Sequence, residues 1–161
     1  MENFLKIAEG LDVAPALAEL ALLPDYCWLR MNSDGAGFVQ LLAGELEWQF
    51  RDELPETWRL IDDLLAILAA EHGDRGRLVH ARVGRMPPGW GLAPHFDGVD
   101  GLVRRRYQLA LRSEPGVVLT VDGEALYPRP GDAWRIDASR VHSIHNGSNF
   151  DRIALLFDTG A

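Results

Sequence analysis

From Arg77 onward the chain is a succession of short apolar runs separated by turn sequences, and this pattern restricts the fold more than any other feature. The turns contain Pro-Gly and Asp-Gly pairs, which favour sharp changes of chain direction. The sequence PPGWGLAP at residues 87–94 is interpreted as one such turn. Strands are expected over residues 77–86, 103–112, 116–123, 124–129, 132–137, 141–146 and 152–158. Many short strands at this spacing are typical of a β-sandwich or β-barrel, so the second half is predicted to be mainly β.

The first half is richer in helix-forming residues. The sequence APALAELALL predicts a helix over residues 14–23, with Asp12 as its N-cap. The clearest helix is predicted over residues 55–74, because apolar side chains recur there at spacings of three and four. Gly73 is placed to end that helix, since glycine readily adopts the left-handed conformation at a C-terminus.

Two short strands are also expected before the long helix, at residues 27–31 and 38–44, with a turn at residues 33–37 between them. No linker, repeat or low-complexity segment interrupts the sequence. We therefore expect a single domain over residues 1–161. Its helix-rich part, residues 1–76, would buttress a β core at residues 77–158.

Composition narrows the class of protein. The chain has 161 residues, of which 47% are hydrophobic and 25% charged, and these shares are typical of a folded globular protein. It has 24 acidic against 16 basic residues and a net charge of −8, which argues against a partner held by bulk positive charge, such as nucleic acid. Cys27 is the only cysteine, so neither an intramolecular disulfide nor a cysteine-based zinc site is expected. The first residues do not resemble a signal peptide and no apolar run is long enough to cross a membrane, so a cytoplasmic protein is expected.

A possible metal site is indicated by His95-Phe96-Asp97 together with His142. On an extended segment, residues i and i+2 point the same way, so His95 and Asp97 can face one metal ion while His142 reaches it from another strand. Two imidazoles and one carboxylate are a ligand set that suits Fe(II) and leaves coordination positions open. A His-x-Asp pair alone is common by chance, and a structural role is the alternative. His145 lies three residues from His142, so on a strand it would face the other side.

Arg152 strengthens this interpretation. It stands on the apolar run RIALLFD, and strand alternation places it on one face with Ala154 and Leu156. A buried arginine needs an anionic partner, and a bound carboxylate matches its planar guanidinium. The alternative is an arginine at the rim that pairs with Asp151 or Asp137.

The stretches RMPPGWGLAPHFDG and VHSIHNGSNFDRIALLFD, with the basic segment RRRYQLAL and a Pro-Gly-Asp-x-Trp turn between them, form an ordered set of motifs. This set resembles the aspartyl/asparaginyl β-hydroxylase family of Fe(II)- and 2-oxoglutarate-dependent dioxygenases, including small bacterial proline hydroxylases. The likeness covers roughly residues 77–158. It implies a double-stranded β-helix (jelly roll, cupin-like) and an enzyme that uses Fe(II), 2-oxoglutarate and O₂ to hydroxylate a C–H bond.

The resemblance also implies roles for individual residues. His95, Asp97 and His142 would be the iron ligands, and Arg152 would hold the distal carboxylate of 2-oxoglutarate. Arg106 matches an arginine that contacts a carboxylate beside the iron. A further position, Gln108, stands where many members have histidine and is a candidate co-substrate contact.

The expected substrate is a small amino-acid-like or peptidyl molecule that bears a carboxylate. Arg82 and Arg85 are the candidates for holding that carboxylate, while Trp90 and Trp134 would shape the pocket or simply pack in the core. His80 is assigned neither to the pocket nor to the core.

Two other functions remain open at this point. A cupin-type metalloenzyme would use the same barrel without 2-oxoglutarate, although such sites usually rely on three or four histidines. A non-catalytic β-barrel domain that binds a small acid is the second alternative.

Overall fold

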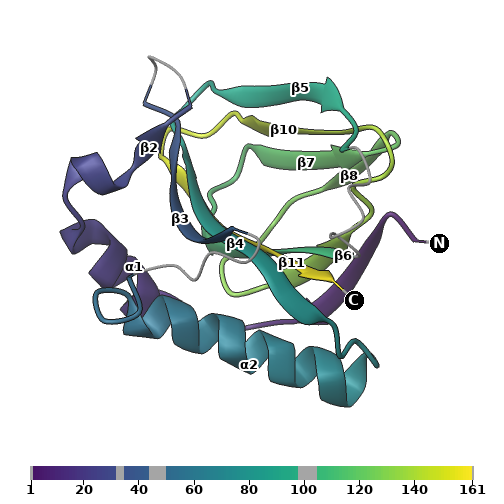
Figure 1. The fold of residues 1–161 in the computed structure, drawn as a ribbon. Coiled ribbons are helices and arrows are strands. Elements are labelled where there is room, and N and C mark those ends of the chain that lie inside the picture. The colour runs from purple at the N-terminus through teal and green to yellow at the C-terminus, as the bar shows by residue number, and fades with distance from the viewer. Residues whose placement is uncertain (1, 32–34, 44–49, 98–104, 161) are drawn as a thin grey trace.

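The computed structural model describes residues 2–31, 35–43, 50–97 and 105–160. Within them the strands form two antiparallel sheets that face each other (Figure 1). The large sheet has the strand order β1-β9-β6-β11-β4-β3-β2 and the small sheet the order β5-β10-β7-β8. The large sheet consists of β1 (Phe4–Ala8), β2 (Leu29–Arg30), β3 (Gly37–Ala43), β4 (Arg77–Met86), β6 (Arg105–Arg112), β9 (Ala133–Ile136) and β11 (Arg152–Gly160). The small sheet consists of β5 (Gly91–His95), β7 (Val117–Val121), β8 (Glu124–Leu126) and β10 (His142–Asn146).

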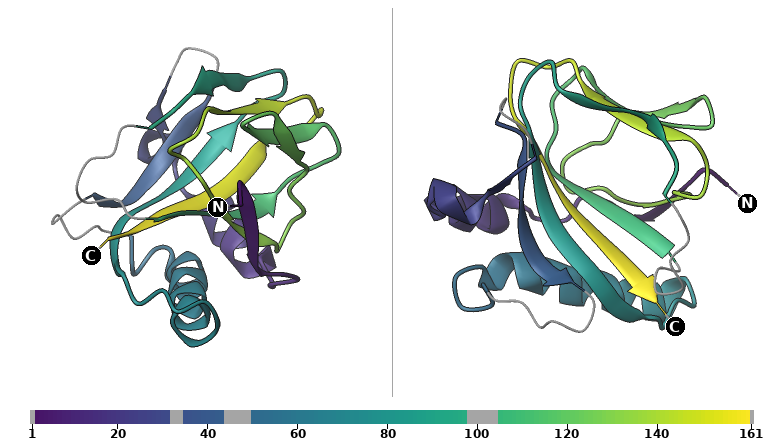
Figure 2. Two further views of the ribbon diagram at one scale, coloured as in Figure 1. Left: turned by 90° about the vertical axis from the view of Figure 1, so that its right-hand side faces the viewer. Right: turned by 45° about the horizontal axis from the view of Figure 1, so that its top comes forward.

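The chain crosses repeatedly between these sheets. It passes from β4 in the large sheet to β5 in the small one, returns to β6, continues through β7 and β8, and then visits β9, β10 and β11 alternately. Figure 2 shows the two sheets curving around a common interior. This winding is the double-stranded β-helix, or jelly roll, so the predicted fold class is confirmed.

The outer face of the large sheet is covered by two helices, α1 (Ala14–Leu22) and α2 (Pro55–Glu71), while the 3₁₀ turn η1 (Asp25–Cys27) leads from α1 to β2 (Figure 1). Apolar side chains of α2 pack there against residues such as Leu155 and Phe157 of β11. A smaller apolar cluster, formed by Met86, Leu119, Val121, Ile136 and Ile144, lies between the two sheets. Strand alternation thus divides β11, with one row of side chains toward the helices and the other toward the interior.

The helix ends differ in detail from the prediction. Val13, and not Asp12, is the N-cap of α1, and the Asp12 carboxylate instead accepts a hydrogen bond from the N–H of Ala14 at 3.2 Å. At the other helix, α2 ends at Glu71 and Gly73 follows it with a φ of 65°, as expected for a glycine that closes a helix. Among the described helices, none is both long and apolar enough to cross a membrane.

Two strands were not expected from the sequence. The region interpreted as a turn contains β5, an edge strand, and an edge tolerates Pro94 because its missing N–H is not needed for pairing. Gly91 permits the close approach to β10, since a Cβ there would lie 2.5 Å from the carbonyl oxygen of Ile144. β1, for which nothing was predicted, pairs with β9. Parts of the predicted strands at 38–44 and 103–112 and of the turn at 33–37 lie outside the described residues.

Candidate metal centre

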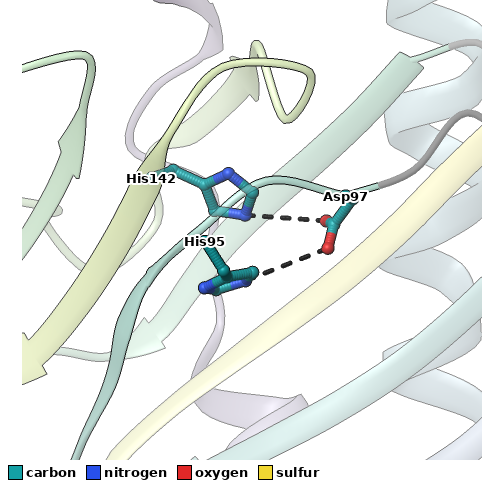
Figure 3. A group of neighbouring side chains, drawn as sticks. All are labelled: His95, Asp97 and His142. Carbon is teal, nitrogen blue, oxygen red and sulfur yellow. Dashed lines mark ion pairs between the residues drawn. The ribbon is translucent and has the colours of Figure 1, made fainter.

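Three side chains with metal-ligating groups converge where β5 ends and β10 begins (Figure 3). His95 is the last residue of β5, Asp97 follows two positions later, and His142 is the first residue of β10. His95 and His142 are direct partners in the β5–β10 pairing, which sets their rings 4.3 Å apart. One ligand atom from each of the three residues lies within 4.8 Å of the other two. The i, i+2 spacing thus brings His95 and Asp97 together, and the pairing of β5 with β10 places His142 beside them.

Backbone hydrogen bonds orient both imidazole rings. Nδ1 of His95 lies 2.7 Å from the carbonyl oxygen of Ala93, and Nδ1 of His142 lies 2.9 Å from that of Arg140. Because a carbonyl can only accept, each Nδ1 carries the proton and each Nε2 presents a lone pair. The Nε2 atoms face the Asp97 carboxylate at 3.9 Å from His95 and 3.5 Å from His142 (Figure 3). Both rings are thus in the tautomer that binds a metal through Nε2.

The donor set fits Fe(II). Two neutral imidazoles and one carboxylate on one side of an ion form the arrangement that leaves positions open for small molecules. In the described part of the chain, this is the only group of three or more potential ligands that comes together. His145 lies farther along β10 with an exposed side chain and does not join the group, and neither does His80.

A charged network holds Asp97. The guanidinium of Arg106 on β6 donates a hydrogen bond to Asp97 through Nη1. It also donates two to Asp158 on β11, from Nε at 2.9 Å and from Nη2 at 3.0 Å. Burial alone would lower the pKa of Arg106, but the hydrogen bonds and charges of the two carboxylates raise it. Arg106 is therefore a fixed cation that hydrogen-bonds to one candidate metal ligand.

The structure contains a cavity of about 90 Å³ beside the three side chains, and Arg152 lies at its buried side. Arg152 is 2% exposed, and its Nη2 donates to Oε1 of Gln108 at 2.8 Å. Its Nε is buried and has no partner among the described residues. Neither Asp137 nor Asp151 pairs with it, so the alternative of a rim arginine is not observed. Burial lowers the pKa of Arg152 to about 10, which still leaves it charged at neutral pH.

Small residues make room next to Arg152. Gly84 on β4 pairs with Ala154 on β11, which in turn pairs with Ala110 on β6. Leu156, two residues farther along β11, lies 3.7 Å from the position that a Cβ of Gly84 would take. Gly84, Arg152 and Leu156 all line the 90 Å³ cavity.

The predicted substrate-contacting residues lie in different surroundings. Arg82 and Arg85 both line the 90 Å³ cavity, and Arg85 also stacks over the ring of Trp28 at 4.4 Å. Trp134 lines a much smaller space beside Gln108 and Arg152. Trp90 packs against the apolar cluster between the sheets, as the packing alternative suggested.

A second chamber, of about 250 Å³, adjoins the first and shares Arg82, Arg106 and Leu156 with it. Its described lining is completed by Gln40, Ala43, His80 and Asp158. The sequence reasoning missed Gln40 and Asp158. Asp158 could have been found, because it stands six residues after Arg152 and so shares its face of the strand.

Comparisons with known proteins agree with this geometry. Residues 38–160 match the model of the family described as Aspartyl/Asparaginyl beta-hydroxylase. An oxidoreductase of the 2OG-Fe(II) oxygenase family from Burkholderia pseudomallei is 15% identical, with 92% of this chain and 77% of that chain covered and a TM-score of 0.72. A Pseudomonas putida prolyl-4-hydroxylase is 16% identical over 100% of this chain and 94% of that chain, with a TM-score of 0.68. The viral collagen prolyl hydroxylase of Paramecium bursaria Chlorella virus-1 is 13% identical over 99% and 96%, also with a TM-score of 0.68. No curated protein sequence matches the chain.

Proposed function

Because the chain belongs to the aspartyl/asparaginyl β-hydroxylase family, we propose that it is an Fe(II)- and 2-oxoglutarate-dependent dioxygenase. The proposed reaction hydroxylates a C–H bond of a small amino-acid-like or peptidyl substrate that bears a carboxylate. The observation that carries the proposal is the combination of His95, Asp97 and His142 with the buried cation of Arg152 in one cavity. Solved structures with this fold include 2-oxoglutarate oxygenases and prolyl hydroxylases, which supports the same class.

The metal would be held by Nε2 of His95, Nε2 of His142 and a carboxylate oxygen of Asp97. When bound, Fe(II) supplies oxidation chemistry in which one atom of O₂ enters the substrate and the other enters 2-oxoglutarate, which leaves as succinate and CO₂. The backbone carbonyls of Ala93 and Arg140 keep both rings in the required tautomer. Arg106 fixes the orientation of Asp97.

The co-substrate would occupy the 90 Å³ cavity, which Gly84 and Arg152 line. Its distal carboxylate meets the guanidinium of Arg152, and the Gln108 amide holds that guanidinium in place. Apolar side chains line the remaining walls and limit the access of water, which strengthens the attraction between the two charges. They include Leu92, Leu119, Ile136, Ile144 and Leu156.

The same observations give less support to the two alternative functions. A cupin-type enzyme without 2-oxoglutarate leaves the buried charge of Arg152 without a function, and the described cluster holds only two histidines. A domain that only binds a small acid explains Arg152 but not the matched tautomers of His95 and His142.

One experiment separates these functions. The protein is mixed anaerobically with Fe(II) and 2-oxoglutarate, and the broad visible charge-transfer band of the ternary complex is recorded. The dioxygenase proposal requires a band that disappears in His142→Ala, weakens strongly in Arg152→Ala and persists in His145→Ala, the control on the same strand. Metal binding without a band would favour the cupin alternative, and the absence of metal binding would favour the acid-binding domain.

A further inference from the structure

A small space of about 10 Å³ adjoins the 90 Å³ cavity between the sheets. Four residues line both, namely Gln108, Leu119, Ile136 and Arg152. The lining that belongs to the small space alone includes Ala110, Asp132 and Trp134, on or next to β6 and β9. The side chain of Arg152 therefore borders the metal-side cavity and also this second, much smaller space.

Two buried hydrogen-bond donors on the lining have no acceptor. Among the described residues, six buried side-chain polar atoms lack a hydrogen-bond partner, and two of the six belong to residues of this small space. They are Nε of Arg152 and Nε1 of Trp134. Both nitrogens can only donate, and a buried donor without an acceptor is destabilising. The space that the two residues share is therefore the place where an acceptor is expected.

Strand order brings the two donors to the same place. Gln108 on β6 is the register partner of Trp134 on β9, so both side chains stand on one face of the sheet. From β11, on the other side of β6, Arg152 donates through Nη2 to Oε1 of Gln108 at 2.8 Å. Nε lies on the same edge of the planar guanidinium as Nη2. The unpartnered donors thus belong to the two side chains on either side of Gln108.

The size of the space selects one water molecule as the acceptor. A volume of about 10 Å³ is close to the least that a single water needs, and it leaves no room for a carboxylate group. A water can accept from both donors and can donate to oxygens of Gln108 and Asp132. The Asp132 carboxylate, which is 7% exposed, accepts from the N–H of Gly10 at 3.2 Å and lies 3.3 Å from Nζ of Lys6. Carboxylate and amide oxygens have lone pairs for a further donor.

We propose that one internal water joins Nε of Arg152 to Nε1 of Trp134, and that Trp134 is thereby a positioning residue for the co-substrate. The water holds the Nε edge of the guanidinium, while Gln108 holds Nη2. Nη1, which faces the sulfur of Met86 at 3.9 Å, is then directed toward the 90 Å³ cavity, which Met86 also lines. The positioning role rests on the proposed dioxygenase function, whereas the water site itself does not.

The test compares Trp134→Phe with wild type, because phenylalanine keeps an aromatic ring but removes the indole N–H. Trp58→Phe is the matched control, since Trp58 is 4% exposed and its Nε1 is also buried without a partner, but it packs between α2 and the large sheet. With Fe(II) under nitrogen, the visible band gives the Kd of 2-oxoglutarate and of 2-oxovalerate, which has a methyl group in place of the distal carboxylate. Titration with Co(II) gives the metal affinity without co-substrate.

Trp134→Phe is expected to bind 2-oxoglutarate about 10-fold more weakly, as expected for one lost hydrogen bond that supports a charged group. Its affinities for 2-oxovalerate and Co(II) should stay at the wild-type values, and Trp58→Phe should change none of the three. A merely structural effect of Trp134 would lower all three affinities together. An unchanged affinity for 2-oxoglutarate, or an equal loss for both acids, overturns the positioning role.

A crystal structure of the wild-type protein tests the water directly. It should show one water within about 3.2 Å of Nε of Arg152 and of Nε1 of Trp134. A space without solvent, or one filled by a carboxylate oxygen of 2-oxoglutarate, overturns the water site. Absence of the visible band in wild type with 2-oxoglutarate would instead contradict the proposed function and would leave the crystallographic result on the water unaffected.

Discussion

Arg106 and Asp158 are joined by two parallel hydrogen bonds, of 2.9 and 3.0 Å, across the paired strands β6 and β11. These two hydrogen bonds fix the plane of the Arg106 guanidinium and leave its Nη1 directed at Asp97. Asp158 is almost fully buried and contributes no atom to the three-residue metal cluster. We therefore propose that it acts on the candidate metal centre through Arg106, as a positioning residue.

Asp158→Asn should weaken metal binding. The amide keeps the size of the side chain but cannot accept both hydrogen bonds from Arg106, so the guanidinium and Asp97 become less ordered. Changes to groups that orient metal ligands typically reduce metal affinity about 10- to 100-fold, and we expect the lower end of this range. Anaerobic titration with Co(II), followed by its visible absorption, measures the change. Asp63→Asn on the exposed face of α2 is the control, and equal affinities for the two variants would contradict the positioning role.

Arg152→Met should abolish stabilisation by 2-oxoglutarate. At a ligand concentration of about 100 Kd, binding adds about 2.7 kcal/mol to the free energy of unfolding, which raises Tm by several degrees. Methionine fills a similar space beside Met86 but offers no charge to the distal carboxylate. The difference in Tm with and without 2-oxoglutarate, measured with Fe(II) under nitrogen, should therefore fall to nearly zero. A variant that still gains the wild-type increment would show that the co-substrate binds elsewhere.

Asp74→Asn should remove a pH-dependent part of the stability. Burial opposes ionisation of Asp74, but hydrogen bonds from Tyr107, the N–H of Gly76 and Thr159 outweigh it and lower the pKa of the carboxyl below 3.8. Because the pKa is lower in the folded state, the ionised carboxyl stabilises the protein at pH values above the unfolded-state pKa of about 3.9. This stabilisation is lost as the pH falls through the folded-state pKa. We expect a cost of about 2 kcal/mol at pH 7 and a shrinking difference from wild type below about pH 4.

Urea denaturation of wild type and Asp74→Asn at several pH values measures this difference. The exposed Asp62→Asn on α2 controls for a general loss of negative charge. A difference between wild type and Asp74→Asn that stays constant from pH 7 to pH 3 would contradict the expected linkage.

Asn146→Ala should destabilise the turn that leads into β11. The buried Asn146 amide donates to the carbonyl oxygens of Met86 and Phe150, and its oxygen accepts from Ser148. Alanine leaves several buried groups without partners, at a cost of about 3 kcal/mol. Chemical denaturation at pH 7 tests this value. Asn149→Ala, at an exposed position of the same turn, should change the free energy of unfolding by less than about 0.5 kcal/mol.

Local sequence patterns were sufficient for the fold class and for most elements. The three- and four-residue spacing in residues 55–74 and the alternation in residues 152–158 are properties of one helix or strand, so they can be read without knowing the partners. The i, i+2 relation of His95 and Asp97 and the inward face of Arg152 follow from the same rule. β5 was missed because its glycine and proline carry no strand signal, and only pairing with β10 makes it extended.

The sequence by itself therefore determined a mainly β protein with a candidate His-Asp-His set and an inward-facing arginine. Tertiary structure alone decided which charges meet. Asp158 could pair with Arg106 because β6 and β11 are neighbours in register, although 52 positions separate the two residues. The same sheet order places Arg82 in the lining of both cavities, near the charges of Arg106, Asp158 and Asp97. Such pairings depend on strand order and register, and these are set by burial of the whole sheet and not by any short segment.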